Sequence, residues 1–214
     1  MTTPYNSEFY HSYIGESEAS AASVVPKIME LFKPSAVIDI GCGVGTWLKV
    51  FRDHGVERLR GLDGSYVKEV DYRIDWSCFR QTNLENPDRP QNENFDLAIC
   101  LEVAEHIAPD KAEGFVDFLV ECADVIVFSA AIPNQGGTDH RNEQWQSFWA
   151  SKFINRGFYA TDLLRSQIWG NDQCAYYYQQ NMILYVKRES PWITQLNRAQ
   201  WQSDADRCQI LDVV

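Results

Sequence analysis

The segment that most constrains this chain is residues 37–47, which read Val-Ile-Asp-Ile-Gly-Cys-Gly-Val-Gly-Thr-Trp. Residues 37–40 have the apolar character of a short buried strand, and glycines follow at positions 41, 43 and 45. After Thr46, apolar residues recur with helical spacing until Gly55. Glycines allow a ligand to approach the backbone closely, and a helix N-terminus offers unpaired N–H groups. The segment therefore predicts a ligand site, in which Asp39 orders the loop or holds a cationic group through water.

Two nucleotide cofactors compete for this loop. A nicotinamide site has the pattern Gly-x-Gly-x-x-Gly/Ala, which demands a small residue where this chain has Thr46. The observed pattern, Asp-x-Gly-x-Gly-x-Gly, resembles motif I of the class I methyltransferases that use S-adenosylmethionine (SAM). A second short strand ends in Asp63, 18 residues after Gly45, about where an acid binds a ribose diol. The resemblance extends over roughly residues 16–188, and we expect SAM rather than a nicotinamide cofactor.

The resemblance also implies which side chains hold SAM. It places an Asp or Asn after the third strand, near the adenine amino group, and this chain has Asn83 followed by Leu84. The alternative for Asn83 is a turn residue before Asn86 and Pro87. The expected cofactor-binding residues are Asp39, Gly41, Gly43, Gly45, Asp63, Asn83 and Leu84.

Strand-like and helix-like segments alternate along most of the chain. Strands are expected at residues 36–40, 59–62, 79–82, 95–101, 124–129, 158–161 and 181–187, and helices include 16–31, 110–122 and 143–156. Alternation of this kind predicts an α/β fold with a doubly wound, mostly parallel seven-stranded sheet that binds ligands at its carboxyl edge. The resemblance implies a Rossmann-like methyltransferase fold whose last strand is antiparallel and enters through a hairpin-like excursion at residues 169–180.

The predicted domain spans residues 1–188. The resemblance implies that residues 1–35 form N-terminal cap helices over the cofactor or substrate mouth, and the alternative is a loose terminus anchored by its aromatic residues. Residues 189–214 form a C-terminal tail that the core does not require. The sequence leaves open whether this tail packs back on the domain or joins the subunits of a homo-oligomer.

A second informative segment follows the strand at residues 95–101. If helical turns begin there, Glu102, Glu105 and His106 lie at i, i+3 and i+4 on one face. A later glycine-containing loop carries His140, which the topology should bring to the same sheet edge. The set resembles that of the metal-dependent O-methyltransferases, among them enzymes that methylate the terminal 2′-hydroxyl of small RNAs. In that resemblance a divalent ion (Mg²⁺, Mn²⁺, Fe²⁺ or Zn²⁺) binds Glu102, Glu105, His106 and His140.

Two other interpretations of these side chains remain open. In a metal-free site, His106 or His140 is the catalytic general base. In a purely structural interpretation, His140 caps a helix and His106 is a buried, hydrogen-bonded side chain.

A bound cation would help the expected reaction. A hydroxyl is a poor nucleophile at neutral pH, and a bound cation lowers its pKa and fixes the oxygen in line with the methyl group.

The expected function is SAM-dependent O-methylation of a small molecule or sugar. The run Tyr176, Tyr177 and Tyr178 precedes three amide side chains, a mixture of ring faces and polar groups that suits sugar recognition. One alternative is an RNA 2′-O-methyltransferase, and another is a non-catalytic SAM-binding subunit. A nicotinamide-dependent oxidoreductase is the third.

Composition and charge disfavour some classes of binding partner. The chain carries 19 basic and 30 acidic residues, a net charge of −11, with no cluster of Lys or Arg, which disfavours nucleic acid. No apolar run approaches the ~20 residues needed to cross a bilayer. The N-terminal residues lack a signal-peptide pattern, and the six cysteines lack metal-finger spacing, so we expect buried thiols and a cytoplasmic location.

Overall fold

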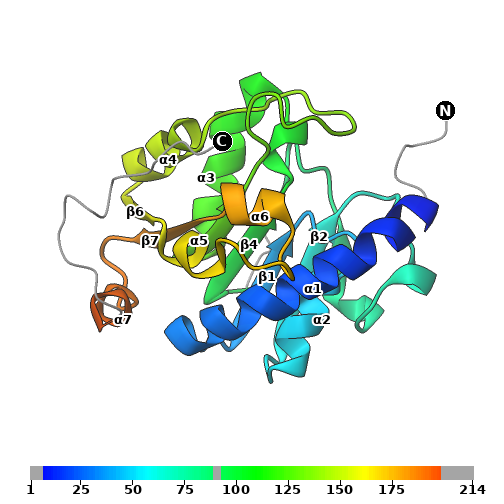
Figure 1. Cartoon of the computed structure of the whole chain (residues 1–214), viewed down its shortest axis with the longest axis horizontal. Coiled ribbons are helices and arrows are strands. Elements are labelled where there is room, and N and C mark those ends of the chain that lie inside the picture. Colours follow the sequence, from blue (N-terminus) through cyan, green and yellow to red (C-terminus); the bar gives the residue numbers. More distant parts are fainter. Residues whose placement is uncertain (1–6, 89–92, 199–214) are drawn as a thin grey trace.

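The computed structural model describes residues 7–88 and 93–198, and a seven-stranded sheet runs through it (Figure 1). The sheet order is β3-β2-β1-β4-β5-β7-β6. Strand β7 is antiparallel to both β5 and β6, and the other strands are parallel to one another. The strands are β1 (Ala36–Ile40), β2 (Arg58–Asp63), β3 (Phe79–Gln81), β4 (Leu97–Leu101), β5 (Val125–Ser129), β6 (Phe158–Thr161) and β7 (Ile183–Lys187). The predicted doubly wound, mostly parallel sheet with an antiparallel last strand is confirmed.

Helices cover both faces of this sheet. They are α1 (Ser7–Phe32), α2 (Thr46–Asp53), α3 (Ala112–Cys122), α4 (Gln146–Asn155), α5 (Leu163–Ile168), α6 (Tyr176–Asn181) and α7 (Ile193–Arg198). Four short 3-10 turns complete the described elements: η1 (Glu69–Asp71), η2 (Trp76–Cys78), η3 (Ala104–His106) and η4 (Pro109–Lys111). No helix in the described residues has the length and apolarity that a membrane crossing requires.

The alternation of side chains along each strand divides the core in two. Val37 packs with the residues of α1, α2, α5 and α6, whereas its neighbour Ile38 packs with those of α3 and α4. Figure 1 shows α1 and α6 crossing in front of the sheet. All five residues of β1, β4 and β5 are buried, which explains why these strands read as continuous apolar runs rather than as alternating ones. The two helical layers thus fix the sheet and leave its carboxyl edge for ligands.

Several predicted boundaries differ from the structure. The N-terminal cap is one helix, α1, with Pro26 inside it, and its first residues begin well before the predicted start at residue 16. The expected hairpin-like excursion at residues 169–180 is wrong, because the segment leads into helix α6. Helix α4 begins at Gln146 rather than at residue 143.

Part of the predicted tail packs back on the domain. Trp192 meets Phe32 of α1 edge to face, with 6.0 Å between ring centroids, and Leu196 of α7 is buried. Residues 199–214 lie outside the described residues. Of the cysteines predicted to be buried thiols, Cys42, Cys100, Cys122 and Cys174 are buried and free, whereas Cys78 is free but only partly buried. Cys208 falls in the part of the chain that is not described.

The glycine loop generates a stability prediction. Gly41 has φ +82°, and a Cβ there would lie 2.2 Å from Cγ2 of Val103. Gly157 has nearly the same φ, +83°, but nothing within 4 Å of such a Cβ. We expect Gly157→Ala to lower the free energy of unfolding by about 1 kcal/mol, because an L side chain is strained at positive φ. Gly41→Ala should lose ~1–3 kcal/mol more, because Val103 must also move.

Urea unfolding of the two variants measures this difference. Equal losses would show that Val103 yields without cost and that the tight packing around Gly41 does not constrain the loop.

Candidate functional site

The loop after β1 is tied to the end of β2. Its glycines at positions 41, 43 and 45 have φ values of +82°, +51° and +78°. The Gly43 N–H donates to Oδ2 of Asp63 at 2.6 Å, and the Gly41 N–H donates to the Leu62 carbonyl at 2.8 Å. The glycine loop and the acid at the end of β2, both predicted cofactor residues, are therefore in direct contact.

Asp63 is almost fully buried, and its carboxylate already accepts several hydrogen bonds. Oδ1 accepts from the Gly64 N–H at 2.7 Å and from the Tyr66 hydroxyl. Burial raises the pKa of Asp63, and these hydrogen bonds partly oppose that rise. Because Oδ1 already has two donors, a ribose diol that binds it must displace the Tyr66 hydroxyl.

Two cavities meet at the glycine loop. The larger, about 650 Å³, lies over the end of β2 and is lined by Asp63, Asn83 and Leu84 among others. The smaller, about 340 Å³, is lined by Asp39, Thr46, Trp47 and the residues after β4. Gly41, Gly43, Glu102 and His106 line both. One elongated ligand can therefore pass over the glycine loop from one cavity into the other.

Asn83 is a turn residue, one of the two interpretations that the sequence left open, and its role toward a cofactor stays a prediction. Its Oδ1 accepts from the Glu85 N–H at 3.1 Å, which is the hydrogen bond of a turn residue. It also lines the larger cavity beside Leu84. An amide oxygen has a second lone pair, so the turn does not prevent Asn83 from accepting a hydrogen bond from a ligand.

Asp39 is a buried carboxylate in the wall of the smaller cavity, with only 3% of its surface exposed. Burial raises its pKa well above the ordinary value, and the charge of Asp63 adds to the rise. An ionised Asp39 therefore destabilises the folded state and favours a cationic ligand nearby.

Glu102 departs from the expected helical arrangement. Its φ is +55°, so it lies in the left-handed region and outside the 3-10 turn Ala104–His106 that follows. The carboxylate accepts from the side-chain amide of Gln135 at 2.9 Å and from that of Asn181 at 3.2 Å. The prediction that Glu102, Glu105 and His106 share one helical face is wrong, because β4 ends in this left-handed residue.

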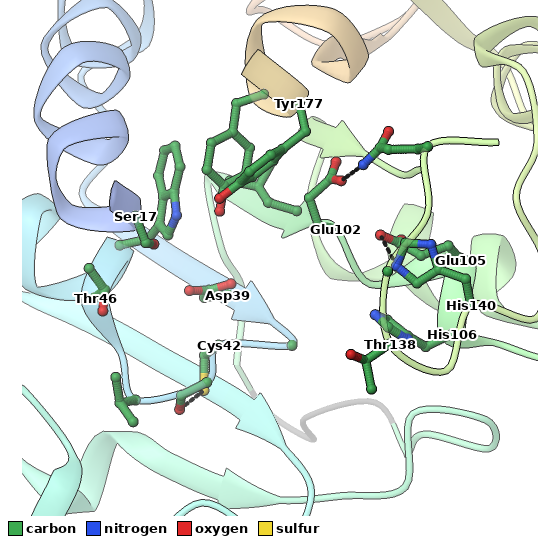
Figure 2. A pocket seen from close by; sticks show the side chains of 18 of the residues that line it. Ser17, Asp39, Cys42, Thr46, Glu102, Glu105, His106, Thr138, His140 and Tyr177 are labelled. Carbon is green, nitrogen blue, oxygen red and sulfur yellow. Dashed lines mark hydrogen bonds and ion pairs between the residues drawn. The ribbon is translucent and has the colours of Figure 1, made fainter. Parts of the chain in front are cut away.

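Glu105, His106 and His140 converge on the wall of the smaller cavity. Their ligand atoms lie within 4.8 Å of one another. Glu105 is fully buried, no side chain donates a hydrogen bond to its carboxylate, and Oε1 lies 4.0 Å from Nε2 of His140. Figure 2 shows this group on one side of the pocket, with Asp39 and Cys42 on the other.

The charge balance of this group suits a cation. Burial raises the pKa of Glu105 well above its ordinary value, and the nearby Glu102 raises it further. Burial lowers the pKa of His106, which keeps its imidazole neutral. A buried carboxylate that no side chain donates to, beside two imidazoles, offers donor atoms that could hold a divalent ion, so these residues fit such an ion.

Each imidazole is held through Nδ1. His140 Nδ1 contacts Oε1 of Glu143 at 2.9 Å, and His106 Nδ1 contacts the carbonyl oxygen of Asp139 at 3.3 Å. The two rings meet edge to face, with 5.0 Å between their centroids. Carboxylate and carbonyl oxygens only accept, so in each ring Nδ1 is the donor nitrogen.

Three consecutive tyrosines of α6 line the smaller cavity on its other side. Tyr178 is buried against Trp47, with 5.2 Å between ring centroids. The Tyr177 hydroxyl donates to Glu16 of α1 at 3.3 Å, whereas Tyr176 is 63% exposed. α1 also contributes Ser17 to the wall of this cavity.

Several residues at the site were not predicted from the sequence. Gln135 and Asn181 donate hydrogen bonds to Glu102 but lie 33 and 79 residues from it along the chain. At such separations the local sequence pattern does not indicate the contact. Glu143 could have been found, because an acid three residues after a loop histidine is within reach of its ring.

The chain is similar to a known protein family and to many solved structures. A family model described as a methyltransferase domain matches residues 13–160. No curated protein matches the sequence of this chain. Many solved structures share the fold, at sequence identities that establish the fold alone.

Three of these structures illustrate the similarity. The methyltransferase domain of a bacterial Hen1 (CtHen1) is 18% identical, with 78% of this chain and 97% of that chain covered and a TM-score of 0.55. Magnesium protoporphyrin IX methyltransferase from Synechocystis PCC 6803, solved with bound S-adenosylhomocysteine (SAH), is 16% identical, with coverages of 87% and 90% and a TM-score of 0.58. An O-methyltransferase family protein from Burkholderia thailandensis is 13% identical, with coverages of 86% and 59% and a TM-score of 0.63.

Asp39 provides a prediction that separates stability from binding. Its folded-state pKa lies above the unfolded value, so its stabilising contribution is present at low pH and is lost as the pH rises through the folded pKa. We expect Asp39→Asn to raise the Tm of the ligand-free protein by a few degrees at pH 8 and by less at pH 5. The same variant should bind SAH more weakly, because it lacks the charge that attracts the ammonium group.

Thermal unfolding at both pH values and calorimetric titration with SAH check the two effects. A lower Tm at pH 8 would contradict this account, since it would mean that the Asp39 carboxylate stabilises the ligand-free fold.

Proposed function

The chain belongs to the methyltransferase-domain family, and on that basis we propose that it transfers the methyl group of SAM to a hydroxyl oxygen of a small molecule or sugar. The proposal includes a divalent metal ion that binds beside the acceptor. The observation that carries it is the fully buried Glu105, whose carboxylate receives no side-chain hydrogen bond and whose Oε1 lies 4.0 Å from Nε2 of His140, on the wall of a cavity that adjoins the glycine loop.

The two joined cavities support a division of the cofactor between them. We assign the adenosine half to the larger cavity, where Asp63 receives the ribose and Asn83 and Leu84 border the adenine. The amino-acid half then lies along the glycines beside Asp39. This places the methyl group at the junction of the cavities, which Glu102 and His106 also line.

Glu105, His106 and His140 would hold the ion. A divalent ion in this position supplies Lewis acidity that lowers the pKa of a neighbouring hydroxyl. Glu102, whose carboxylate accepts from the amides of Gln135 and Asn181, would complete the expected set of four. These imidazoles and carboxylates would orient the acceptor oxygen toward the methyl carbon.

The reaction forms an oxygen–carbon bond and breaks the sulfur–carbon bond of SAM, so SAH leaves as the product. The acceptor hydroxyl loses its proton in the process. In the metal-free form of the proposal, Nε2 of His140 accepts that proton, because Nδ1 already carries one.

The walls of the smaller cavity favour an uncharged or cationic acceptor. Its described lining includes Asp39, Glu102 and Glu105 but neither Lys nor Arg. Tyr176 and Tyr177 add ring faces of the kind that pack on sugars. A net charge of −11 also disfavours a polyanionic acceptor. The alternative is RNA 2′-O-methylation, which the structural likeness to the bacterial Hen1 domain supports. Turnover with a short RNA tests it.

Turnover with a panel of acceptors tests the reaction. Release of SAH from SAM is measured with vicinal-diol glycosides, a catechol and a short RNA bearing a free 3′-terminal ribose. We expect turnover with at least one small diol, loss of that turnover in EDTA and recovery on addition of Mn²⁺. Turnover that survives chelation would contradict the metal, and turnover with RNA alone would contradict the small acceptor.

Metal binding gives a prediction that does not depend on the acceptor. Titration of the SAH-bound protein with Mn²⁺ should find one site per chain. Glu105→Gln should weaken that site by more than about 100-fold, beyond the range of outer-shell partners, because a ligand oxygen is lost. SAH affinity should be unchanged.

Glu113→Gln is the matched control for the loss of one negative charge. Glu113 pairs with Lys152 and Arg156 on the far helical layer. Equal Mn²⁺ affinity in the Glu105 and Glu113 variants would overturn the assignment of Glu105 as a ligand.

A further inference from the structure

Glu143 lies outside the group formed by Glu105, His106 and His140, yet it organises the loop that carries His140. Its Oε1 contacts Nδ1 of His140 at 2.9 Å and accepts from the Gly136 N–H at 3.2 Å. Its Oε2 accepts from the Asn134 N–H at 2.8 Å. One carboxylate therefore holds both the backbone of the loop and the ring at its end.

The backbone of the loop also holds the ring in place from another side. A Cβ at Gly137 would lie 2.3 Å from Nε2 and 2.4 Å from Cε1 of His140, so the glycine backbone packs directly on the imidazole. The His106 ring meets the same imidazole edge to face, at an interplanar angle of 80°. With Glu143 on Nδ1, these contacts fix the orientation of the ring.

The hydrogen bond to Glu143 decides which nitrogen of His140 carries the proton. An ionised carboxylate has no proton to donate, so Nδ1 must be the donor. In the neutral ring the lone pair is then on Nε2, the atom that lies 4.0 Å from Oε1 of Glu105 in the wall of the smaller cavity. With the opposite tautomer, an N–H group would occupy that position.

We propose that Glu143 is a positioning residue that selects the Nδ1–H tautomer of His140 and so presents the Nε2 lone pair to the cavity. The inference rests on the proposed function only for the use made of that lone pair. A metal ligand and a general base both require it, so Glu143 serves either form of the site.

Glu143→Gln tests the proposal because it preserves shape and can put an NH₂ group in the place of Oε1. In that orientation the glutamine oxygen still accepts from the Asn134 N–H, while the NH₂ group faces Nδ1 as a donor and the hydrogen bond from the Gly136 N–H is lost. The proton of the neutral ring should therefore move to Nε2. Glu143→Ala removes both the hydrogen bonds to the loop backbone and the contact with Nδ1 of His140. Glu113→Gln controls for the loss of one negative charge, because Glu113 belongs to a distant ion pair.

The tautomer is read from ¹⁵N chemical shifts and long-range ¹H–¹⁵N correlations of the metal-free, SAH-bound protein at pH 8.5. His140→Gln identifies the resonances of His140. We expect Nδ1–H in the wild type and in Glu113→Gln, and Nε2–H in Glu143→Gln at a Tm above that of Glu143→Ala. Mn²⁺ affinity should fall by about 10–100-fold in Glu143→Gln.

The outcomes separate this inference from the proposed function. If the wild type binds no Mn²⁺ but the tautomer still reverses in Glu143→Gln, the inference stands and the metal is lost from the proposal. An Nε2–H tautomer in the wild type, or the same tautomer in the wild type and Glu143→Gln, would overturn the role of Glu143. A fall in Tm equal to that of Glu143→Ala, with no tautomer change, would show that Glu143 only anchors the loop.

Discussion

The hydrogen bond from the Gly43 N–H to Asp63 joins the first loop of the sheet to the end of its second strand. The rest of the site is built outward from this junction. Because Gly41 has no side chain, Val103 packs against the loop, and the segment after β4 reaches the same edge. That segment carries Glu105 and His106, so the glycine loop and these two side chains line one pair of joined cavities. The position of the chemistry is thus a consequence of how three neighbouring parallel strands end.

The site also concentrates negative charge that the ligand-free fold does not neutralise. Burial raises the pKa of Asp39, of Asp63 and of both glutamates after β4. A fold under selection for stability alone would replace such groups with apolar ones. A sulfonium, an ammonium and a divalent ion are the species that would compensate these carboxylates. The electrostatic cost in the free protein therefore agrees with the cofactor and metal that the proposal invokes.

Local patterns predicted the fold well, whereas contacts between distant segments escaped prediction. The buried strands and the positive-φ glycines could be read directly, because their constraints lie within a few residues. The left-handed conformation of Glu102 could not, since nothing in its neighbours forbids a helical turn there. Its hydrogen bond to Asn181 depends on the packing of α6 over the end of β4. The helix Tyr176–Asn181 before β7 escaped prediction for a related reason, because its sequence has no clear apolar period that would indicate a helix.

The central claim is that the methyl donor and the group Glu105, His106 and His140 face each other across one cavity. Crystals grown with SAH and Mn²⁺, with diffraction data collected at an energy where manganese scatters anomalously, test it most directly. The account predicts an anomalous peak among those three side chains, and SAH with its ribose on Asp63 and its sulfur beside the glycine loop. A peak elsewhere with these side chains unliganded, or SAH bound away from the glycine loop, would contradict it.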